Sequence, residues 1–284
     1  MNTNRVISTE NMPDTVQGLS EDINSRQLLH RKENMQERFY LLSLETVSEE
    51  ETAHILNNIY LKLDEERRLY LEKIKHKRKR LESAAAGLLL QLAIQEAHGQ
   101  SRFLREGEGT RLFTLDGLLE AAGRPFDLKY IYGSCGKPYL KNYPYFFSLS
   151  HSADYVLCAF SEREIGADIQ QEKECSWERI AERCFTKEEM RKLARRGMKE
   201  ERKSFFYERW CRKEAYGKLT GKGMTASMGK NVDDLAHWIE VQGPQGYRIA
   251  ACVCAATDDT SESVKVKTGD GFSDEKITGI FKGL

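Results

Sequence analysis

The sequence predicts an α+β fold in which two halves share a similar order of elements. The first half, residues 38–162, runs from a strand through two helical stretches into a group of strands. The second half, residues 163–256, begins with a strand, continues through helices and ends in a hairpin. Ala- and Leu-rich stretches favour helix, whereas aromatic and β-branched runs favour strand. No repeat of letters supports a duplication, so the halves are alike in element order alone.

Two helices of contrasting character are predicted in the first half. Ser48 and Glu51 match a capping box, in which each side chain bonds the other's backbone N–H, so a helix should open here and run through residue 61. The Ala- and Leu-rich stretch 81–98 predicts a buried packing helix ended by Gly99. The other predicted elements are a short helix at 116–122 and strands at 39–44, 129–132, 145–152 and 155–160.

In the second half, a short apolar strand is followed by helices. Thr186 and Glu189 form another capping-box pattern, which predicts a helix through Arg196. A helix over 205–223, rich in straight-chain and aromatic residues, should stop at the glycines that close this stretch. The remaining elements are a strand at 164–170, a helix that ends near 185, and a hairpin of 238–241 with 247–254.

Composition limits the class of protein. The 284 residues suffice for one large domain or two small ones, and 44 basic against 44 acidic residues argue against a dedicated nucleic-acid binder. No signal segment or run of membrane-spanning length is found. The seven cysteines form no CxxC pair and predict reduced thiols in a cytoplasmic protein. Residues 1–37 and 257–284 lack apolar periodicity, so we expect polar extensions there.

The helix over 205–223 places three functional groups on one face. Trp210, Glu214 and Lys218 follow at i, i+4 and i+8. An ordinary Glu–Lys surface pair, which contributes about 0.2–0.5 kcal/mol, is the simplest interpretation. Against it, Asp168 lies inside the predicted strand Ile165–Ile169, where a carboxylate is disfavoured. Some compensation for that carboxylate is expected, and a metal ion is one candidate.

Four further patterns admit a structural and a functional interpretation. The basic run over residues 73–80 is either a solvated helix face or a surface for phosphates, and the basic run over 187–196 is either solvent-exposed or a patch for an acidic protein partner. The Gly-Lys-Pro at 136–138 is either a plain turn or part of a site. Ser150 and His151 end a predicted strand, but no G-x-S-x-G elbow supports a serine hydrolase.

Four of these pieces, taken in order, resemble a known family. They are GKP at 136–138, SLSHS at 148–152, IGADI at 165–169 and WCRKEAYGKL at 210–219. Together they resemble the Sfp-type 4'-phosphopantetheinyl transferases, the long, single-chain class, over residues 39–256. The resemblance implies a pseudo-two-fold pair of α+β half-domains with the active site in the cleft between them. It also allows a monomer.

The resemblance implies a reaction and a set of roles. Phosphopantetheine would pass from coenzyme A, the co-substrate, to a serine of an acyl- or peptidyl-carrier protein, with release of 3',5'-ADP; neither nucleic acid nor a membrane takes part. Asp168 and Glu214 would ligate Mg2+, Glu214 would be the general base, and Lys218 would hold pyrophosphate charge. The residues that would contact coenzyme A phosphates are Lys218, Lys137, Ser150, His151 and either Arg78 or Arg80.

Two departures from the family pattern keep other hypotheses open. Gln170 stands where many members have a third acid, so it could ligate the metal only as a neutral oxygen. Glu82 stands where an arginine is common, and its charge would weaken nucleotide binding unless Arg80 replaces that contact. These departures favour a non-catalytic module that binds coenzyme A or a carrier protein. A third hypothesis is a hydrolase that uses Cys211 and His151.

Overall fold

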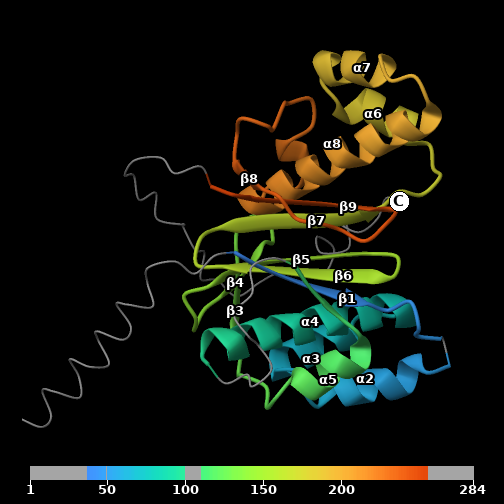
Figure 1. The fold of residues 1–284 in the computed structure, drawn as a ribbon. Coiled ribbons are helices and arrows are strands. Elements are labelled where there is room, and N and C mark those ends of the chain that lie inside the picture. The colour runs from blue at the N-terminus through green and yellow to red at the C-terminus, as the bar shows by residue number, and fades with distance from the viewer. Residues whose placement is uncertain (1–36, 49, 100–109, 255–284) are drawn as a thin grey trace, which may run out of the picture. The chain divides into compact units, whose positions relative to one another are not determined.

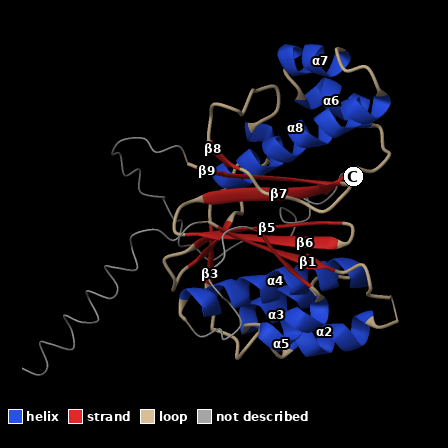
Figure 2. Ribbon diagram, in the orientation of Figure 1, coloured by secondary structure: helices blue, strands red, loops and turns tan. Residues whose placement is uncertain are grey.

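The computed structural model describes residues 37–48, 50–99 and 110–254, which lie in one compact unit that begins at Glu37. The predicted polar extensions at 1–37 and 257–284 lie outside the described residues, apart from Glu37 itself. Two sheets occupy the middle of this unit, and helices cover their outer sides (Figure 1; Figure 2). The mixed α+β class is therefore confirmed. Within the part of the chain that the structure describes, no helix is long and apolar enough to cross a membrane.

The first sheet has the strand order β2-β1-β6-β5. Its members are β1 (Arg38–Ser43), β2 (Thr110–Phe113), β5 (Phe146–Ser152) and β6 (Tyr155–Ser161). Strands β1 and β2 are parallel, whereas β6 is antiparallel to both β1 and β5. Strand β2 has no counterpart in the sequence prediction. A separate two-stranded antiparallel sheet pairs β3 (Tyr130–Tyr132) with β4 (Pro138–Leu140).

Helices cover the outer face of the first sheet (Figure 1). They are α2 (Thr52–Tyr60), α3 (Glu65–Glu72), α4 (Lys77–Ala97) and α5 (Leu115–Ala121). Helix α4 packs against β1, β5 and β6, and 14 of its 21 residues are buried, as its Ala- and Leu-rich sequence predicts. It begins at Lys77, four residues earlier than expected, and this early start brings Arg78 and Arg80 onto its first turns.

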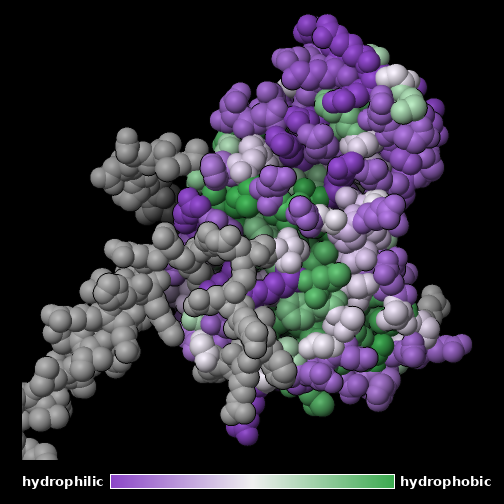
Figure 3. Space-filling view, viewed as in Figure 1, coloured by the Kyte–Doolittle hydropathy of each residue, from purple (hydrophilic) through white to green (hydrophobic). Residues whose placement is uncertain are grey.

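The second sheet has the order β7-β9-β8 and is antiparallel throughout. Its strands are β7 (Ile165–Gln171), β8 (His237–Ile239) and β9 (Tyr247–Val253), and the helices of this half are α6 (Trp177–Cys184), α7 (Lys187–Ala194) and α8 (Lys199–Thr220). Helix α8 lies along β7 and β9, and a left-handed Gly221 at φ 67° ends it. The surface over α6, α7 and α8 is predominantly hydrophilic (Figure 3).

The two sheets share a core. They are also joined where β5 contacts β7, a contact that we call the seam. Alternate residues of β1 and β6 pack against alternate residues of β7 and β9; the buried members are Phe39, Leu41, Tyr155, Leu157, Ala159, Ile165, Ala167, Ile169, Ala251 and Val253. Strands β5 and β7 are edge strands of their own sheets and lie next to each other. Serine hydroxyls of β5 accept hydrogen bonds from backbone N–H groups of β7. The seam thus satisfies amides that an edge strand otherwise leaves unpaired.

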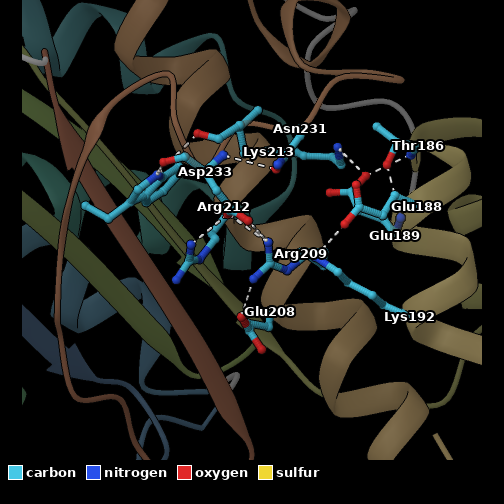
Figure 4. A network of polar contacts seen from close by, with 12 residues as sticks. Thr186, Glu188, Glu189, Lys192, Glu208, Arg209, Arg212, Lys213, Asn231 and Asp233 are labelled. Atoms are coloured by element: carbon cyan, nitrogen blue, oxygen red, sulfur yellow. Dashed lines mark hydrogen bonds and ion pairs between the residues drawn. The ribbon is translucent and has the colours of Figure 1, made fainter. Parts of the chain in front are cut away.

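A network of charged side chains joins α7, α8 and the loop after α8 (Figure 4). The ammonium of Lys213 is fully buried and lies 3.0 Å from a carboxylate oxygen of Glu189, which forms the predicted capping box of α7 with Thr186. Its Nζ also donates to the carbonyl of Lys230 at 2.5 Å. Because a buried charge is tolerated only when it is paired and hydrogen-bonded, these contacts hold the loop against α8.

A second carboxylate of this network has an altered affinity for protons. Asp233 accepts two hydrogen bonds from Arg209 at 2.7 Å and one from Arg212 at 2.8 Å. Burial raises its pKa, but hydrogen bonds and charge from the two guanidinium groups outweigh burial, so the pKa of Asp233 lies below its ordinary 3.8. A carboxyl with a lowered folded-state pKa stabilises the fold above its unfolded-state pKa and loses that contribution as the pH falls.

We expect Asp233→Asn to remove part of the loss of stability in acid. The free energy of unfolding of the wild type should fall between roughly pH 5 and pH 3, because protonation of Asp233 then removes its ion pairs with Arg209 and Arg212. The variant should be less stable at pH 7 and fall less steeply below pH 5, as measured by urea unfolding across this range. The exposed neighbour Asp234 gives a matched control, Asp234→Asn, which should follow the wild type. If the free energy of unfolding fell equally steeply below pH 5 for Asp233→Asn and the wild type, the expectation would be refuted.

Candidate active site

The approach of α8 to β7 is set by one glycine. A Cβ added to Gly166 would lie 2.1 Å from the carbonyl oxygen of Ala215 and 2.4 Å from the amide nitrogen of Leu219. The backbone of α8 therefore lies directly on β7, a distance that a side chain at this position would prevent. Asp168 is two residues further along β7 and points to the same side as Gly166. The carboxylate in the strand is thus presented to the helix.

Asp168 is surrounded by hydrogen-bond donors. It is 2% exposed, and its Oδ1 accepts from the hydroxyl of Ser150 at 2.6 Å and from the ammonium of Lys218 at 2.7 Å. Its Oδ2 accepts from the amide of Gln170 at 2.9 Å. Lys218 also donates to the carbonyl of Leu149 at 3.3 Å. The expected compensation for a carboxylate in a strand is therefore supplied by these donors, and a metal ion is not needed to explain its presence.

Glu214 lies one helical turn before Lys218 and is half-buried. Burial raises its pKa to about 7, with the negative charge of Asp168 adding to the rise and Lys218 opposing it. Two carboxyl groups far apart in the sequence, Asp168 and Glu214, are thus close enough to interact. A carboxylate with a pKa near neutrality can accept and release a proton at physiological pH, as a general base must.

A second group of side chains gathers at the end of β5. The Nδ1 of His151 is 3.1 Å from a carboxylate oxygen of Glu82, whose other oxygen is 3.5 Å from Nε of Arg78. Arg78 also binds Asp154 at 2.9 Å. We call these four residues the Arg78 cluster. His151 directly follows Ser150 in β5, so the cluster and the carboxylates approach the same segment of chain. The charge of Glu82 is met within this cluster by Arg78 and His151.

Two other predicted site residues have different partners. The Nε of Arg80 donates to the carbonyl of Ile74 at 2.8 Å. Lys137 is largely buried; its ammonium binds Glu164 at 3.0 Å and the carbonyl of Leu219, the residue after Lys218, at 2.8 Å. Lys137 thereby ties the β3–β4 turn to the start of β7 and to the last turn of α8, where a cation interacts favourably with the helix dipole.

The structure contradicts the hydrolase hypothesis. Cys211 is fully buried, and its thiol donates to the backbone carbonyl of Asp168 at 3.1 Å. Burial, with the nearby negative charge of Asp168, raises the pKa of Cys211 well above its usual range. A buried neutral thiol is a poor nucleophile, so Cys211 is a packing residue.

Oxygen ligands for a cation are few. Among the described residues, no group of three or more His, Cys, Asp or Glu side chains gathers where a metal ion could be held. Asp168 and Glu214 are the interacting pair of carboxylates in this region. Gln170, expected as a neutral third ligand, directs its amide nitrogen toward Asp168. Any cation here would therefore share two carboxylates and take its remaining ligands from water or substrate.

Sequence reasoning missed several residues that shape the site. The burial of Lys213 cannot be deduced from a Lys-Glu dipeptide in a helix, because its partner Glu189 comes from another helix. The close approach at Gly166 is equally a property of two elements. A signal was available for the seam, since Ser148, Ser150 and Ser152 alternate along a predicted strand and must share one face.

Comparison with known proteins gives a consistent family. The family model of the 4'-phosphopantetheinyl transferase superfamily matches residues 164–274. The chain is 38% identical to 4'-phosphopantetheinyl transferase Sfp of Bacillus subtilis (strain 168) over 100 residues, which are 35% of this chain and 44% of that protein. It is 40% identical to 4'-phosphopantetheinyl transferase psf-1 of Bacillus pumilus over 91 residues, 32% of this chain and 38% of that protein.

A longer match is found with 4'-phosphopantetheinyl transferase ffp of Bacillus subtilis. The two are 32% identical over 155 residues, which are 49% of this chain and 67% of that protein. The matches to Sfp and psf-1 span less than half of those relatives. The family model begins at Glu164, just before β7, so its match includes Asp168, Glu214 and Lys218.

Proposed function

Because the chain belongs to the 4'-phosphopantetheinyl transferase superfamily, we propose that it is a transferase that moves the 4'-phosphopantetheine group of coenzyme A onto a serine hydroxyl of a carrier protein. The observation that carries the proposal is the contact of Lys218 with Asp168 at 2.7 Å, beside a Glu214 whose pKa is about 7. Family membership alone supports only the class of reaction. The arrangement of an acid pair and an ammonium supports the specific roles.

Each of the three side chains has a task in this proposal. Glu214 accepts the proton of the carrier serine as the serine oxygen attacks the β-phosphorus of coenzyme A. The bond from that phosphorus to the bridging oxygen breaks, and 3',5'-ADP leaves with the electron pair. Lys218 offsets the negative charge of the pyrophosphate. Asp168 holds Lys218 in place through the 2.7 Å contact. Because burial, with the charge of Asp168 adding to it, raises the pKa of Glu214 to about 7, the group is partly ionised at neutral pH and can serve as the base.

The donor set of the site fits Mg2+. This ion prefers hard oxygen ligands and usually takes one or two carboxylates together with substrate phosphates and water, which matches a site with two carboxylates and no third acid. Asp168 and Glu214 would hold it. When bound, the ion would draw charge from the phosphoryl oxygens. The repulsion between the two carboxylates, which contributes to the raised pKa of Glu214, is the kind of interaction that a divalent cation offsets.

We place the nucleotide end of coenzyme A at the Arg78 cluster. Two of the predicted phosphate ligands, Arg78 and His151, contact the same carboxylate of Glu82, and Ser150, next to His151 in β5, bonds Asp168. Arg80 and Lys137, which bind backbone carbonyls and Glu164, are weaker candidates for phosphate contacts. In this arrangement coenzyme A would extend from the first turns of α4, past the end of β5, to the middle of α8.

The proposal includes the pseudo-two-fold architecture and the biological setting. Each sheet is covered on its outer side by one long helix, α4 or α8, which supports a pair of related half-domains, residues 38–162 and 163–256. The partner is an acyl- or peptidyl-carrier protein, and the basic run over 187–196, which begins with α7, offers a surface for an acidic partner. The enzyme would act as a cytoplasmic monomer, with no role for nucleic acid or a membrane.

Intact-protein mass spectrometry tests the function directly. The purified chain is incubated with Mg2+, coenzyme A and a panel of apo-carrier proteins, and each carrier is weighed. One carrier or more should gain the mass of a single phosphopantetheine group, and replacement of its acceptor serine by alanine should abolish the gain. Calorimetric binding of coenzyme A without any mass gain would instead favour the non-catalytic module that Gln170 and Glu82 suggest.

We expect Gln170→Glu to change the use of metal. The amide of Gln170 donates to Asp168 at 2.9 Å, so a carboxylate there would place a third negative charge against Asp168 and Glu214. A third carboxylate ligand should lower the Mg2+ concentration for half-maximal activity, because the affinity of an oxygen site for a divalent cation depends on its ligand charge. The variant should also depend more steeply on metal for stability, as seen in thermal unfolding with and without EDTA. An unchanged Mg2+ titration would show that this position does not act on the metal.

A further inference from the structure

We propose that Ser150 is a positioning residue for Asp168, and that its hydroxyl determines which carboxylate oxygen of Asp168 is offered to a cation. This inference rests on the proposed function, since it concerns the metal site of that function. It differs from the role that the family resemblance implies for Ser150, which is contact with a coenzyme A phosphate. The contacts of the serine decide between the two roles.

The hydroxyl of Ser150 is committed to β7. Ser150 is 6% exposed; it donates to Oδ1 of Asp168 at 2.6 Å and accepts from the amide of Ile169 at 3.4 Å. A hydroxyl has one proton to donate. Since Ser150 donates that proton to Asp168, it has none left for a phosphate oxygen. A phosphate could recruit this proton only if the bond to Asp168 were broken.

The donors divide the two oxygens of Asp168 into different roles. Oδ1 accepts from both Ser150 and Lys218, so its two lone pairs are occupied. Oδ2 accepts from Gln170 at 2.9 Å. The thiol of Cys211 is 3.7 Å from Oδ2 but 3.1 Å from the backbone carbonyl of Asp168, which is the closer acceptor for its single proton. Oδ2 therefore keeps a lone pair, and it is the oxygen that would ligate a cation.

The neighbouring serines show what is particular to Ser150. Ser148, Ser150 and Ser152 project from one face of β5, and each accepts from a backbone amide of β7, at 2.9, 3.4 and 3.0 Å. Ser148 donates its proton to the carbonyl of Ala167 at 3.2 Å, so it contributes to the seam alone. Ser150 has the longest bond to an amide and gives its proton to a carboxylate instead. Ser150 therefore contributes to the seam and also orients the carboxylate of Asp168.

The loss of such a donor has a known cost. Groups that hydrogen-bond to a metal ligand fix its orientation, and their removal lowers metal affinity about 10–100-fold. In Ser150→Ala, Oδ1 would keep Lys218 only, and the carboxylate could rotate about its last bond. The effect should therefore fall on metal binding, and the affinity for coenzyme A measured without a divalent ion should be unchanged.

Mn2+ binding to the full-length protein, followed by electron paramagnetic resonance, tests the inference without any turnover. Ser150→Ala should bind Mn2+ about tenfold more weakly than the wild type. Ser148→Ala, the matched control, removes an equivalent seam hydroxyl with no contact to Asp168 and should bind Mn2+ as the wild type does. Thermal unfolding of both variants reports the structural loss that they share. If Ser150→Ala does not fold, Ser150→Cys, which keeps the size but donates a weaker hydrogen bond, replaces it in the same comparison.

The possible results separate the inference from the proposed function. Equal Mn2+ affinities for wild type and Ser150→Ala, or no Mn2+ binding by the wild type, would overturn the inference. A normal Mn2+ affinity with a tenfold loss of coenzyme A affinity in EDTA would assign Ser150 to a phosphate. By contrast, a wild type that binds Mn2+ in the expected Ser150-dependent way but modifies no carrier protein would leave the role of Ser150 intact and refute the transferase.

Discussion

Replacement of Glu214 by glutamine should abolish transfer and leave the fold intact. Loss of a general base costs about 10²–10⁴-fold in rate, and Glu214 is also a proposed ligand for Mg2+, so a loss of kcat of roughly a thousandfold or more is expected. Glutamine keeps the size of the side chain and removes a negative charge that is held near Asp168. The variant should therefore unfold at the same temperature as the wild type or at a higher one.

The measurement combines single-turnover transfer to a carrier protein with thermal unfolding. Glu208→Gln is the matched control: Glu208 lies on the same helix and pairs with Arg209 at the surface, away from Asp168. It should retain nearly full activity. Turnover of Glu214→Gln within tenfold of the wild type would remove Glu214 from the role of base. Equal losses in both variants would point to a general disturbance of α8.

Gly166→Ala should damage stability and activity together. The added Cβ would lie 2.1 Å from a carbonyl oxygen and 2.4 Å from an amide nitrogen of α8, both of them backbone atoms that cannot rotate away. Either α8 or β7 must move, and overpacking of this kind costs about 1–3 kcal/mol or more. Glu214 and Lys218 would shift with the helix relative to Asp168, and a displacement of about 1 Å can cost about 100-fold in rate.

Urea unfolding and Mn2+ binding measure the two effects separately. Gly197→Ala provides the control, because a Cβ there would lie 4.0 Å from a carboxylate oxygen of Glu201, an ordinary van der Waals distance. It should change the free energy of unfolding by no more than about 0.5 kcal/mol. If Gly166→Ala were as stable as Gly197→Ala and bound Mn2+ normally, then the close contact between α8 and β7 would not be what sets the geometry of the site.

Much of the fold follows from local sequence. Helix α4 is predictable because it is apolar almost all round, and the capping box of Thr186 and Glu189 forms as expected. Strand β2 was not predictable, since only three of its four residues are half-buried and Leu112 is exposed. Its strand conformation comes from parallel pairing with β1, which is distant in the sequence. Helix α8 begins at Lys199, six residues before the expected start, because Lys and Glu continue the helix and no breaker stands there.

The chemistry of the site was less accessible than the fold. Motifs identify residue types, and Asp168, Glu214 and Lys218 do come together. Partners across elements are set by tertiary structure, so the motif gave no indication that Lys137 binds Glu164 and a carbonyl of α8. Similarly, the expectation that Glu82 opposes anion binding considered its charge alone, whereas its carboxylate holds Arg78 and His151 side by side.

One consequence concerns the size of the ligand. Ser150 and His151 are consecutive in β5, so their side chains leave opposite faces of the strand: one reaches Asp168 on β7, the other reaches Glu82 on α4. A lone inorganic anion is too small to touch both groups at once. A ligand that engages both sides would have to contact Lys218, which lies against Asp168, at one point and Arg78, which lies against Glu82, at another. Under the proposed function, the two faces of β5 would therefore favour a ligand with two separated phosphates over a compact phosphate compound.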